Sequence, residues 1–194
     1  MDKQTRRREQ ALTNKEYRFA IDENHENACT LVVSVMNLEN DDVVDEILHD
    51  IQQENNEGTT NVNIRYRGKN PQRWFSMIYP PVLDPMFLRI GLPGGEKVGW
   101  ISLYASQVEI GRVILSIIIK KTYRNKGIGT VLLQNVETMV ADFYPLEPVT
   151  EIRFCTMENN EPMKRVAEKC HAKKLLNIDA MEPGFLYYAI EPRL

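Results

Sequence analysis

Residues 114–130 of the chain read ILSIIIKKTYRNKGIGT, and this stretch decides the fold. It overlaps a nearly continuous apolar run at 113–119, which predicts a buried β-strand near the centre of a sheet. Two glycines separated by one residue follow, Gly127 and Gly129, and apolar residues at helical spacing then continue over 132–143. The sequence therefore predicts a strand, a glycine turn and a helix in direct succession.

The glycine turn is a candidate phosphate-binding site. Two glycines on either side of one residue let successive main-chain amides turn toward a common point, and the following helix adds about half a positive charge at its N-terminus. Arg124 and Lys126 place two cations beside that point, which suits a pyrophosphate better than a lone carboxylate. The alternative is an ordinary tight turn with a surface arginine. The apolar strand before the turn and the apolar helix after it favour the phosphate site.

Other nucleotide motifs and metal patterns do not fit the sequence. A dinucleotide-binding fingerprint would need a third glycine at position 132, where the chain has Leu132, and the Walker pattern GxxxxGK[ST] cannot be laid over the turn. The three cysteines are scattered without a CxxC pair, and the histidines form no metal-binding pattern. We therefore expect reduced thiols and no metal.

Length and composition indicate a globular α/β protein. The chain has 194 residues, of which 43% are apolar and 26% charged, with a net charge of -3 that offers no overall positive field to nucleic acid. No segment approaches the ~20 apolar residues that span a membrane, so we expect a cytoplasmic protein without a membrane partner. We expect a polar basic arm at 1–16 and one domain at 17–194. The arm, with Arg6, Arg7 and Arg8, is either a solvated surface segment or a contact to RNA or the ribosome.

Apolar patterns place most of the remaining elements. Strands are predicted at 17–21, 31–38, 98–104, 151–156 and 185–190, and helices at 43–51 and 163–169. Acids precede the first helix, where capping is the simpler role and recruitment of a cationic substrate the alternative. The segment 54–92 has an apolar piece at 86–90 among Asn, Gly and Pro breakers, and it is a candidate for substrate specificity because loops on a rigid sheet hold variable functions.

In this context the glycine turn resembles the acyl-CoA signature of the GNAT superfamily of N-acetyltransferases, whose pattern is [RQ]xxGx[GA]. Residues 124–129 read RNKGIG, after a strand and before a Leu-rich helix. A second block is similar too, because Asn160 opens a helix after the strand at 151–156. The sequence RVAEK at 165–169 is most similar to the branch of the family that includes ribosomal-protein N-terminal acetyltransferases and small-amine enzymes. Together the two blocks cover about residues 98–172.

The resemblance implies both a fold and a reaction. The fold is mixed α/β, with a central, mostly antiparallel sheet of about six or seven strands, splayed beside 113–119 and flanked by helices on both faces. The reaction is transfer of an acetyl group from acetyl-CoA to a primary amine by direct attack, without a metal. The acceptor would be a small amine, a protein or peptide N-terminus, or a lysine; a basic peptide or ribosomal partner and a homodimer are left open. The alternative is a non-catalytic acyl-CoA sensor or interaction module.

The resemblance also implies which residues bind the donor. Strand backbone would pair with the pantetheine arm and stabilise the oxyanion, the glycine turn would hold the pyrophosphate, and an asparagine would contact the cofactor from the facing side. The residues so implied are Ile117, Ile118 and Ile119 for the arm, Arg124, Asn125, Lys126, Gly127, Ile128, Gly129 and Thr130 for the pyrophosphate, and Asn160 for the facing side.

The groups that transfer protons depart from the family pattern. Many relatives have a tyrosine seven residues after the helix-opening asparagine, where it protonates the departing thiolate, and this position is Ala167 here. We name Glu109 and Tyr187 as catalytic candidates. Glu109 either accepts an amine proton through water or is a hairpin charge. Alternation on the last strand turns Tyr187 and Tyr188 to opposite faces, so one of them reaches the cleft or both pack in the core or at the edge.

Overall fold

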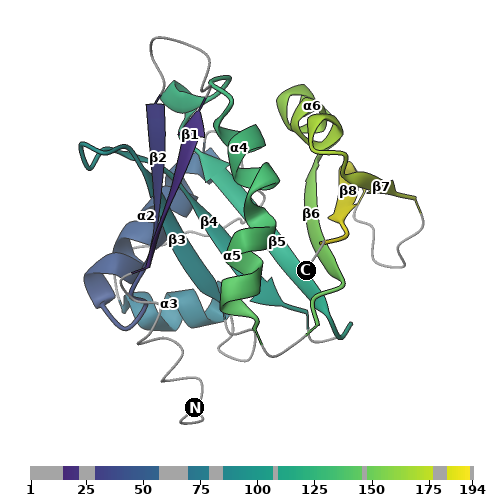
Figure 1. Ribbon diagram of the computed structural model, residues 1–194. Helices are drawn as coiled ribbons and strands as arrows, with labels where there is room; N and C mark the ends of the chain where they lie inside the picture. Colours follow the sequence, from purple (N-terminus) through teal and green to yellow (C-terminus); the bar gives the residue numbers. More distant parts are fainter. Residues whose placement is uncertain are drawn as a thin grey trace.

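A computed structural model of the chain describes residues 15–21, 29–56, 70–78, 85–106, 109–145, 148–176 and 183–192. These residues form one eight-stranded sheet in the order β1-β2-β3-β4-β5-β6-β8-β7, with helices packed against it (Figure 1). Most of the predicted basic arm, including its three arginines, lies outside the described residues.

Strands and helices occur in short runs along the chain. The strands are β1 (Glu16–Ile21), β2 (Cys29–Val35), β3 (Met86–Gly91), β4 (Lys97–Ala105), β5 (Arg112–Ile119), β6 (Glu151–Met157), β7 (Lys173–Leu175) and β8 (Phe185–Ile190). The helices are α2 (Asp41–Asn56), α3 (Pro71–Ile78), α4 (Ile128–Gln134), α5 (Val136–Phe143) and α6 (Glu161–Lys169), with a 3-10 turn, η2 (Lys121–Tyr123), after β5. In the part of the chain described here, no helix is both long and apolar enough to cross a lipid bilayer.

The pairing of β5 with β6 gives the sheet its special feature. The other neighbouring strands pair antiparallel, whereas β5 and β6 run parallel. Their register extends only from Arg112 with Glu151 to Ile114 with Arg153, although both strands continue past this point. The two strands therefore diverge, which confirms the predicted splay beside 113–119 (Figure 1).

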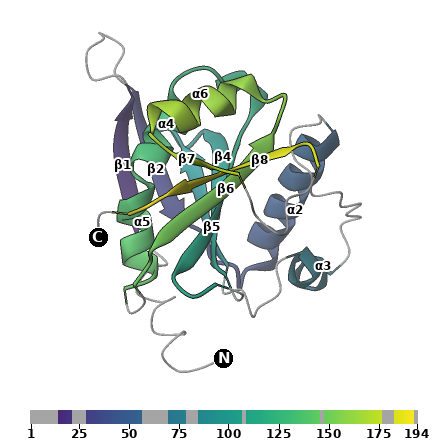
Figure 2. The ribbon, with the colours of Figure 1, turned by 90° about the vertical axis from the view of Figure 1, so that its right-hand side faces the viewer.

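Helices cover both faces of the sheet, as predicted (Figure 2). α4 and α5 pack on one face, where Leu132 and Phe143 are fully buried in the larger core. α2 and α3 pack on the other face, where Ile47 and Phe75 join Trp100 of β4 in a second core. Because apolar residues recur along α2 at spacings of three and four, one side of that helix is buried.

Two differences from the predicted elements have local causes. The sheet has eight strands where six or seven were expected, and two of them had not been assigned as strands. β3 coincides with the apolar piece at 86–90, and β7, with the sequence Lys-Lys-Leu, is too short to show an alternating pattern. The predicted helix over 132–143 is divided into α4 and α5 at Asn135. The Asn135 side chain donates from Nδ2 to the Val131 carbonyl at 2.8 Å, so it competes with the main chain for a helical acceptor.

Strands β4 and β5 approach each other closely at Gly99, which pairs with Ile119. A Cβ added at Gly99 would lie 2.0 Å from the Ile118 carbonyl oxygen and 3.1 Å from the Ile119 Cα. Glycine is therefore required for this approach. The close contact lies directly behind the part of β5 that has left β6.

Candidate functional site

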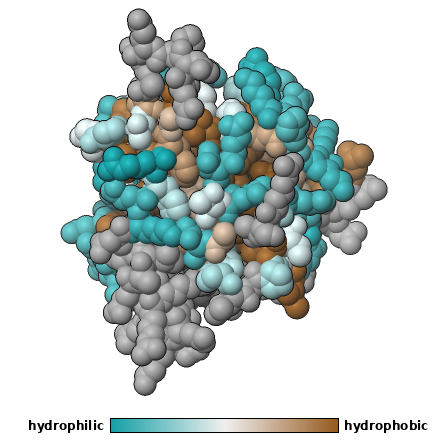
Figure 3. Space-filling model, in the orientation of Figure 1, coloured by the Kyte–Doolittle hydropathy of each residue, from teal (hydrophilic) through white to brown (hydrophobic). Residues whose placement is uncertain are grey.

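A pocket of about 750 Å³ fills the space that opens between β5 and β6. Its walls are the end of β5, the glycine turn with the start of α4, the end of β6, and α6. Figure 3 shows apolar surface in this region between α4 and α6, with polar side chains on either side. The predicted donor-site residues that line the pocket are Ile117, Ile118, Ile119, Arg124, Asn125, Gly127, Ile128, Gly129, Thr130 and Asn160.

The register of β5 decides which of its main-chain groups face the pocket. The Lys120 N–H donates to the Val98 carbonyl of β4 at 2.9 Å, and Ile118 pairs with Trp100 of the same strand. Because main-chain groups of successive residues point to opposite sides of a strand, those of Ile117 and Ile119 face away from β4 toward the gap. This register narrows the prediction that Ile117, Ile118 and Ile119 all pair with the ligand, since the main-chain N–H and carbonyl of Ile118 are directed to β4.

The glycine turn presents main-chain N–H groups to the same space. Gly127 caps α4 with φ 78° and ψ -8°, a left-handed conformation that favours glycine. The first helical hydrogen bond of the turn runs from the Val131 N–H to the Gly127 carbonyl at 3.1 Å. The N–H groups of Ile128, Gly129 and Thr130 therefore have no carbonyl partner inside the helix, and such groups form an anion-binding site.

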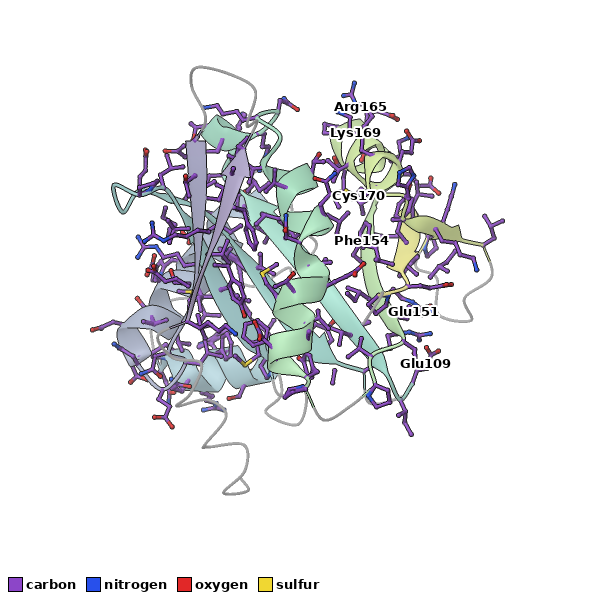
Figure 4. The ribbon with its side chains drawn as sticks, in the orientation of Figure 1. Glu109, Glu151, Phe154, Arg165, Lys169 and Cys170 are labelled. Atoms are coloured by element: carbon purple, nitrogen blue, oxygen red, sulfur yellow. The ribbon has the colours of Figure 1, made fainter. Side chains whose placement is uncertain are left out.

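Helix α6 provides the facing wall. Its first N–H groups are capped by Asn160, whose Oδ1 accepts from the Met163 N–H at 3.2 Å while its Nδ2 donates to Thr156 at 2.9 Å. Arg165 and Lys169 also line the pocket, at an (i, i+4) spacing that places them on one side of the helix (Figure 4). Sequence reasoning missed these two cations, although their spacing after the helix-opening asparagine was a signal that could have indicated them.

The two cations predicted beside the turn have different surroundings. Arg124 lines the pocket and also donates from Nε to the Ile119 carbonyl at 2.9 Å and from Nη2 to Glu54 Oε2 at 2.7 Å. Lys126 does not line the pocket, and its Nζ lies 5.1 Å from the centre of the Tyr123 ring. The structure therefore gives Arg124 a place at the site and directs Lys126 to a neighbouring ring.

Glu109 lies away from the pocket, at the end where β5 and β6 are paired (Figure 4). Its carboxylate forms an ion pair with Arg112 and approaches Arg153 to 3.9 Å. Arg112, where β5 begins, precedes Ile117 by five residues, about 16 Å along an extended strand. The position favours the hairpin-charge interpretation of Glu109 over the catalytic one.

The two tyrosines of β8 do turn to opposite faces. Tyr188 is 5% exposed and stacks on Phe154 with ring centres 5.4 Å apart, and burial raises the pKa of its phenol. Tyr187 is half-buried on the other face and pairs in register with Cys155 of β6. The position of the family's tyrosine is occupied by Ala167, which is fully buried in the core.

A further phenol lies on the same face of the sheet as Tyr187. Tyr104 of β4 pairs with Ile114, the last residue of β5 that is in register with β6. Burial raises the pKa of Tyr104, and the neighbouring Cys155 raises it further, so its phenol is neutral at physiological pH. Sequence reasoning did not identify Tyr104, since nothing local distinguishes it from a strand residue.

Among the described residues no group of three or more His, Cys, Asp and Glu side chains is arranged to hold a metal ion. The site therefore offers main-chain N–H groups and cations around a gap in the sheet. Together they can bind an anionic ligand with an extended amide chain.

Comparisons with known proteins define the class. A family model described as the acetyltransferase (GNAT) family matches residues 48–172, more than half of the chain. The chain belongs to this family and is an acetyl-CoA-dependent N-acetyltransferase, with acetyl-CoA as the donor. No match was found among curated proteins.

Solved structures of low sequence identity share the fold. A spermidine N-acetyltransferase from Vibrio cholerae, in complex with CoA and spermine, is 12% identical with a TM-score of 0.61, over 83% of this chain and 95% of that one. A ribosomal L7/L12 alpha-N-protein acetyltransferase in complex with coenzyme A is 13% identical with a TM-score of 0.61, over 84% and 94%. An acetyltransferase of the GNAT family from Bacillus anthracis is 17% identical with a TM-score of 0.57, over 92% and 97%.

Proposed function

We propose that the protein transfers the acetyl group of acetyl-CoA to a primary amine by direct attack, with the donor bound between β5 and β6. The divergence of these strands is the observation that carries the proposal. It leaves the main-chain groups of Ile117 and the N–H of Ile119 facing a pocket instead of another strand, while the Ile119 carbonyl accepts from Arg124. An extended pantetheine arm can pair with such a strand edge, while the N–H groups at the start of α4 bind the diphosphate.

Titration of the protein with acetyl-CoA in a calorimeter tests the donor site. We expect a dissociation constant of about 1–100 μM, in the range usual for enzyme substrates. No binding heat at millimolar acetyl-CoA would contradict the proposal. The measurement needs no knowledge of the acceptor.

The chemistry requires no covalent enzyme intermediate. A neutral amine attacks the thioester carbonyl, the new C–N bond forms, the C–S bond breaks, and the CoA thiolate leaves. We assign stabilisation of the oxyanion of the tetrahedral intermediate to a main-chain N–H of β5 that faces the pocket. The amine proton passes to water or to a nearby carboxylate, and the thiolate takes a proton from an acid or from water.

Tyr187 is our candidate for the acid that protonates the thiolate. It lies on β8 next to Cys155 of β6, on the strand pair that borders the splay, and the tyrosine usual in the family is replaced by Ala167. A placed acid contributes about 10²–10⁴ in rate. We therefore expect Tyr187→Phe to lower kcat about 100-fold with an unchanged KM for acetyl-CoA.

The adjacent Tyr188 offers a matched control for this test. Tyr188→Phe keeps the ring that stacks on Phe154 and removes the same hydroxyl from the same strand. We expect it to retain kcat within about threefold, in line with the small effect of most single hydrogen bonds. Equal rates for Tyr187→Phe and the wild-type enzyme would contradict the assignment of Tyr187.

The acceptor class is tested with a panel of amines. The solved neighbours named above include a spermidine enzyme and an enzyme that acts on a ribosomal protein, so the panel contains polyamines, peptides with free N-termini and lysine peptides. Two acids of α2, Glu46 and Asp50, give little support for a polyamine, because both bind Lys97. Release of free thiol from acetyl-CoA identifies the acceptor. Donor binding without thiol release across the panel would favour the alternative of a non-catalytic acyl-CoA sensor.

A further inference from the structure

We propose that Glu54, a buried acid near the end of α2, is a positioning residue for the phosphate-binding turn and acts through Arg124. The inference rests on the proposed function and concerns a residue that belongs to neither family block. Glu54 is 5% exposed and lies in the last turns of α2, which packs on the sheet face opposite α4. It therefore connects the turn to the other side of the molecule.

A chain of hydrogen bonds carries the proposal. Glu54 Oε2 accepts from Arg124 Nη2 at 2.7 Å, and Arg124 Nε donates to the Ile119 carbonyl at 2.9 Å. The guanidinium thus ties α2 to the last residue of β5 and to the first residue of the turn. A guanidinium has five N–H donors in a fixed plane, so these two bonds also set the direction of those that remain for the pocket.

The location of Glu54 is otherwise unfavourable for a carboxylate. The C-terminal end of a helix repels an anion. Helix α2 has no basic residue in its last turn to compensate. A carboxylate close to the pocket would also repel the diphosphate of the donor. Pairing with Arg124 places a cation 2.7 Å from the carboxylate and offsets both repulsions.

The turn needs such an anchor because its backbone is unusual. Arg124 is followed by two residues of positive φ, Asn125 at 61° and Gly127 at 78°, before α4 begins at Ile128. The anion-binding N–H groups come directly after them. Holding Arg124 at the entrance of the turn fixes these N–H groups relative to β5, and preorganised donors bind an anion more tightly than mobile ones.

The test compares two donors that differ only in the part of the ligand that the turn binds. Glu54→Gln is assayed with acetyl-CoA and with S-acetylpantetheine, which carries the same thioester and amide chain without the nucleotide or diphosphate. We expect kcat/KM for acetyl-CoA to fall about tenfold, through KM, because a charge-assisted hydrogen bond is lost. We expect kcat/KM for S-acetylpantetheine to stay within twofold of wild type.

Asp50 provides the matched control, one helical turn earlier on α2. Asp50→Asn makes the same exchange of a carboxylate for an amide and breaks an ion pair with Lys97 of β4, which does not line the pocket. We expect kcat/KM for both donors to stay within twofold of wild type. A donor-selective loss in Glu54→Gln alone supports the positioning role.

A double-mutant cycle separates positioning from a general loss of structure. Because Glu54 acts through Arg124, the double variant Glu54→Gln, Arg124→Gln should have a KM for acetyl-CoA within twofold of that of Arg124→Gln alone. If Glu54→Gln does not fold, Arg124→Lys, which keeps the charge and loses the planar fork, should show the same selective loss.

Three outcomes would overturn the inference. They are a wild-type KM in Glu54→Gln, an equal loss for both donors, and independent effects of the two substitutions. Failure of the wild-type protein to bind acetyl-CoA would instead overturn the proposed function, so the two failures are distinguishable.

Discussion

At one end of β5 and β6 the strands pair in register, and Glu151 binds Arg112 at 2.6 Å and Arg153 at 2.7 Å; at the other end the same strands separate around a pocket. Charge is used differently at the two ends. The paired end joins acids and bases, whereas at the open end Arg124 pairs with Glu54 but Arg165 and Lys169 form no ion pair within the described residues. A short paired segment thus holds β5 and β6 together, and the remaining parts of the two strands diverge. We expect substitutions at the paired end to change stability and those at the open end to change donor binding.

The largest effect is expected at the start of α4. Gly129→Asp places a carboxylate where the diphosphate would meet the first N–H groups of the helix, and a Cβ there meets Ile119 and Val166 only at ordinary contact distances of 3.6–3.7 Å. Charge repulsion should therefore weaken acetyl-CoA binding more than 100-fold in a titration, without unfolding the protein. Gly94→Asp adds the same charge to an open hairpin turn and should bind normally. Near-normal affinity in Gly129→Asp would remove the phosphate assignment.

The cations of α6 should have the next largest effect. Arg165→Ala with Lys169→Ala removes two charges that line the pocket and should raise the KM for acetyl-CoA about 10- to 100-fold. The difference in KM between the variant and the wild-type protein should shrink at high salt, because salt screens the attraction between these two cations and the donor. Lys173→Ala with Lys174→Ala removes the same charge from β7, outside the pocket, and serves as the control. Equal KM values in the two double variants would contradict a role for α6.

At the paired end we expect a change in stability instead. Glu151→Gln weakens contacts with both Arg112 and Arg153 in a half-buried position and should lower the free energy of unfolding by about 1–3 kcal/mol. For a chain of this length that corresponds to a fall in Tm of about 2–12 °C in a thermal melt. Affinity for acetyl-CoA should stay within twofold at a temperature where the variant is folded.

An exposed pair gives the reference for that measurement. Glu191 and Lys173 are 4.0 Å apart and largely solvated, so Glu191→Gln should change the free energy of unfolding by less than about 0.5 kcal/mol. If Glu151→Gln weakened donor binding as much as it lowered stability, the separation of the two ends would be wrong.

The smallest effect is expected for Lys126. This position is variable in the family motif, the Nζ of Lys126 lies over the Tyr123 ring, and the residue does not line the pocket. An exposed contact between a cation and a ring is worth about 0.5–1 kcal/mol. We expect Lys126→Ala to change the KM for acetyl-CoA by less than about threefold, and a larger change in steady-state assays would return Lys126 to the binding site.

Much of the fold could be predicted because its elements carry local signals. The central strands are apolar runs, and β8 was predicted with its observed bounds, Phe185–Ile190. Helix α3 was missed although the sequence holds its start, since Asn70 accepts from the Arg73 N–H at 3.1 Å and Pro71 takes the first helical position. β7 could not be found in this way, because its short polar sequence becomes a strand only by pairing with β8.

The residues of the donor site also fall into two groups, those that a local sequence pattern predicted and those that depend on contacts between distant segments. The glycine turn and β5 are contiguous in sequence, so their motif predicted most of the residues that line the pocket. Glu54 lies 70 residues from Arg124 in sequence, and the bond between them exists only because α2 packs behind β5. Tyr104 is similar, since its surroundings come from three strands. Contacts between distant segments were therefore the part that the sequence could not supply.

The glycine at position 99 has a bearing on how this enzyme can diversify. Any side chain there would push β5 away from its antiparallel neighbour and toward β6, and so constrict the cleft from behind. The width of the cleft that receives the acyl donor thus depends on Gly99, a residue that does not contact the donor. Natural variants that accept a bulkier thioester would be expected to remodel the mouth of the cleft while leaving this rear contact untouched.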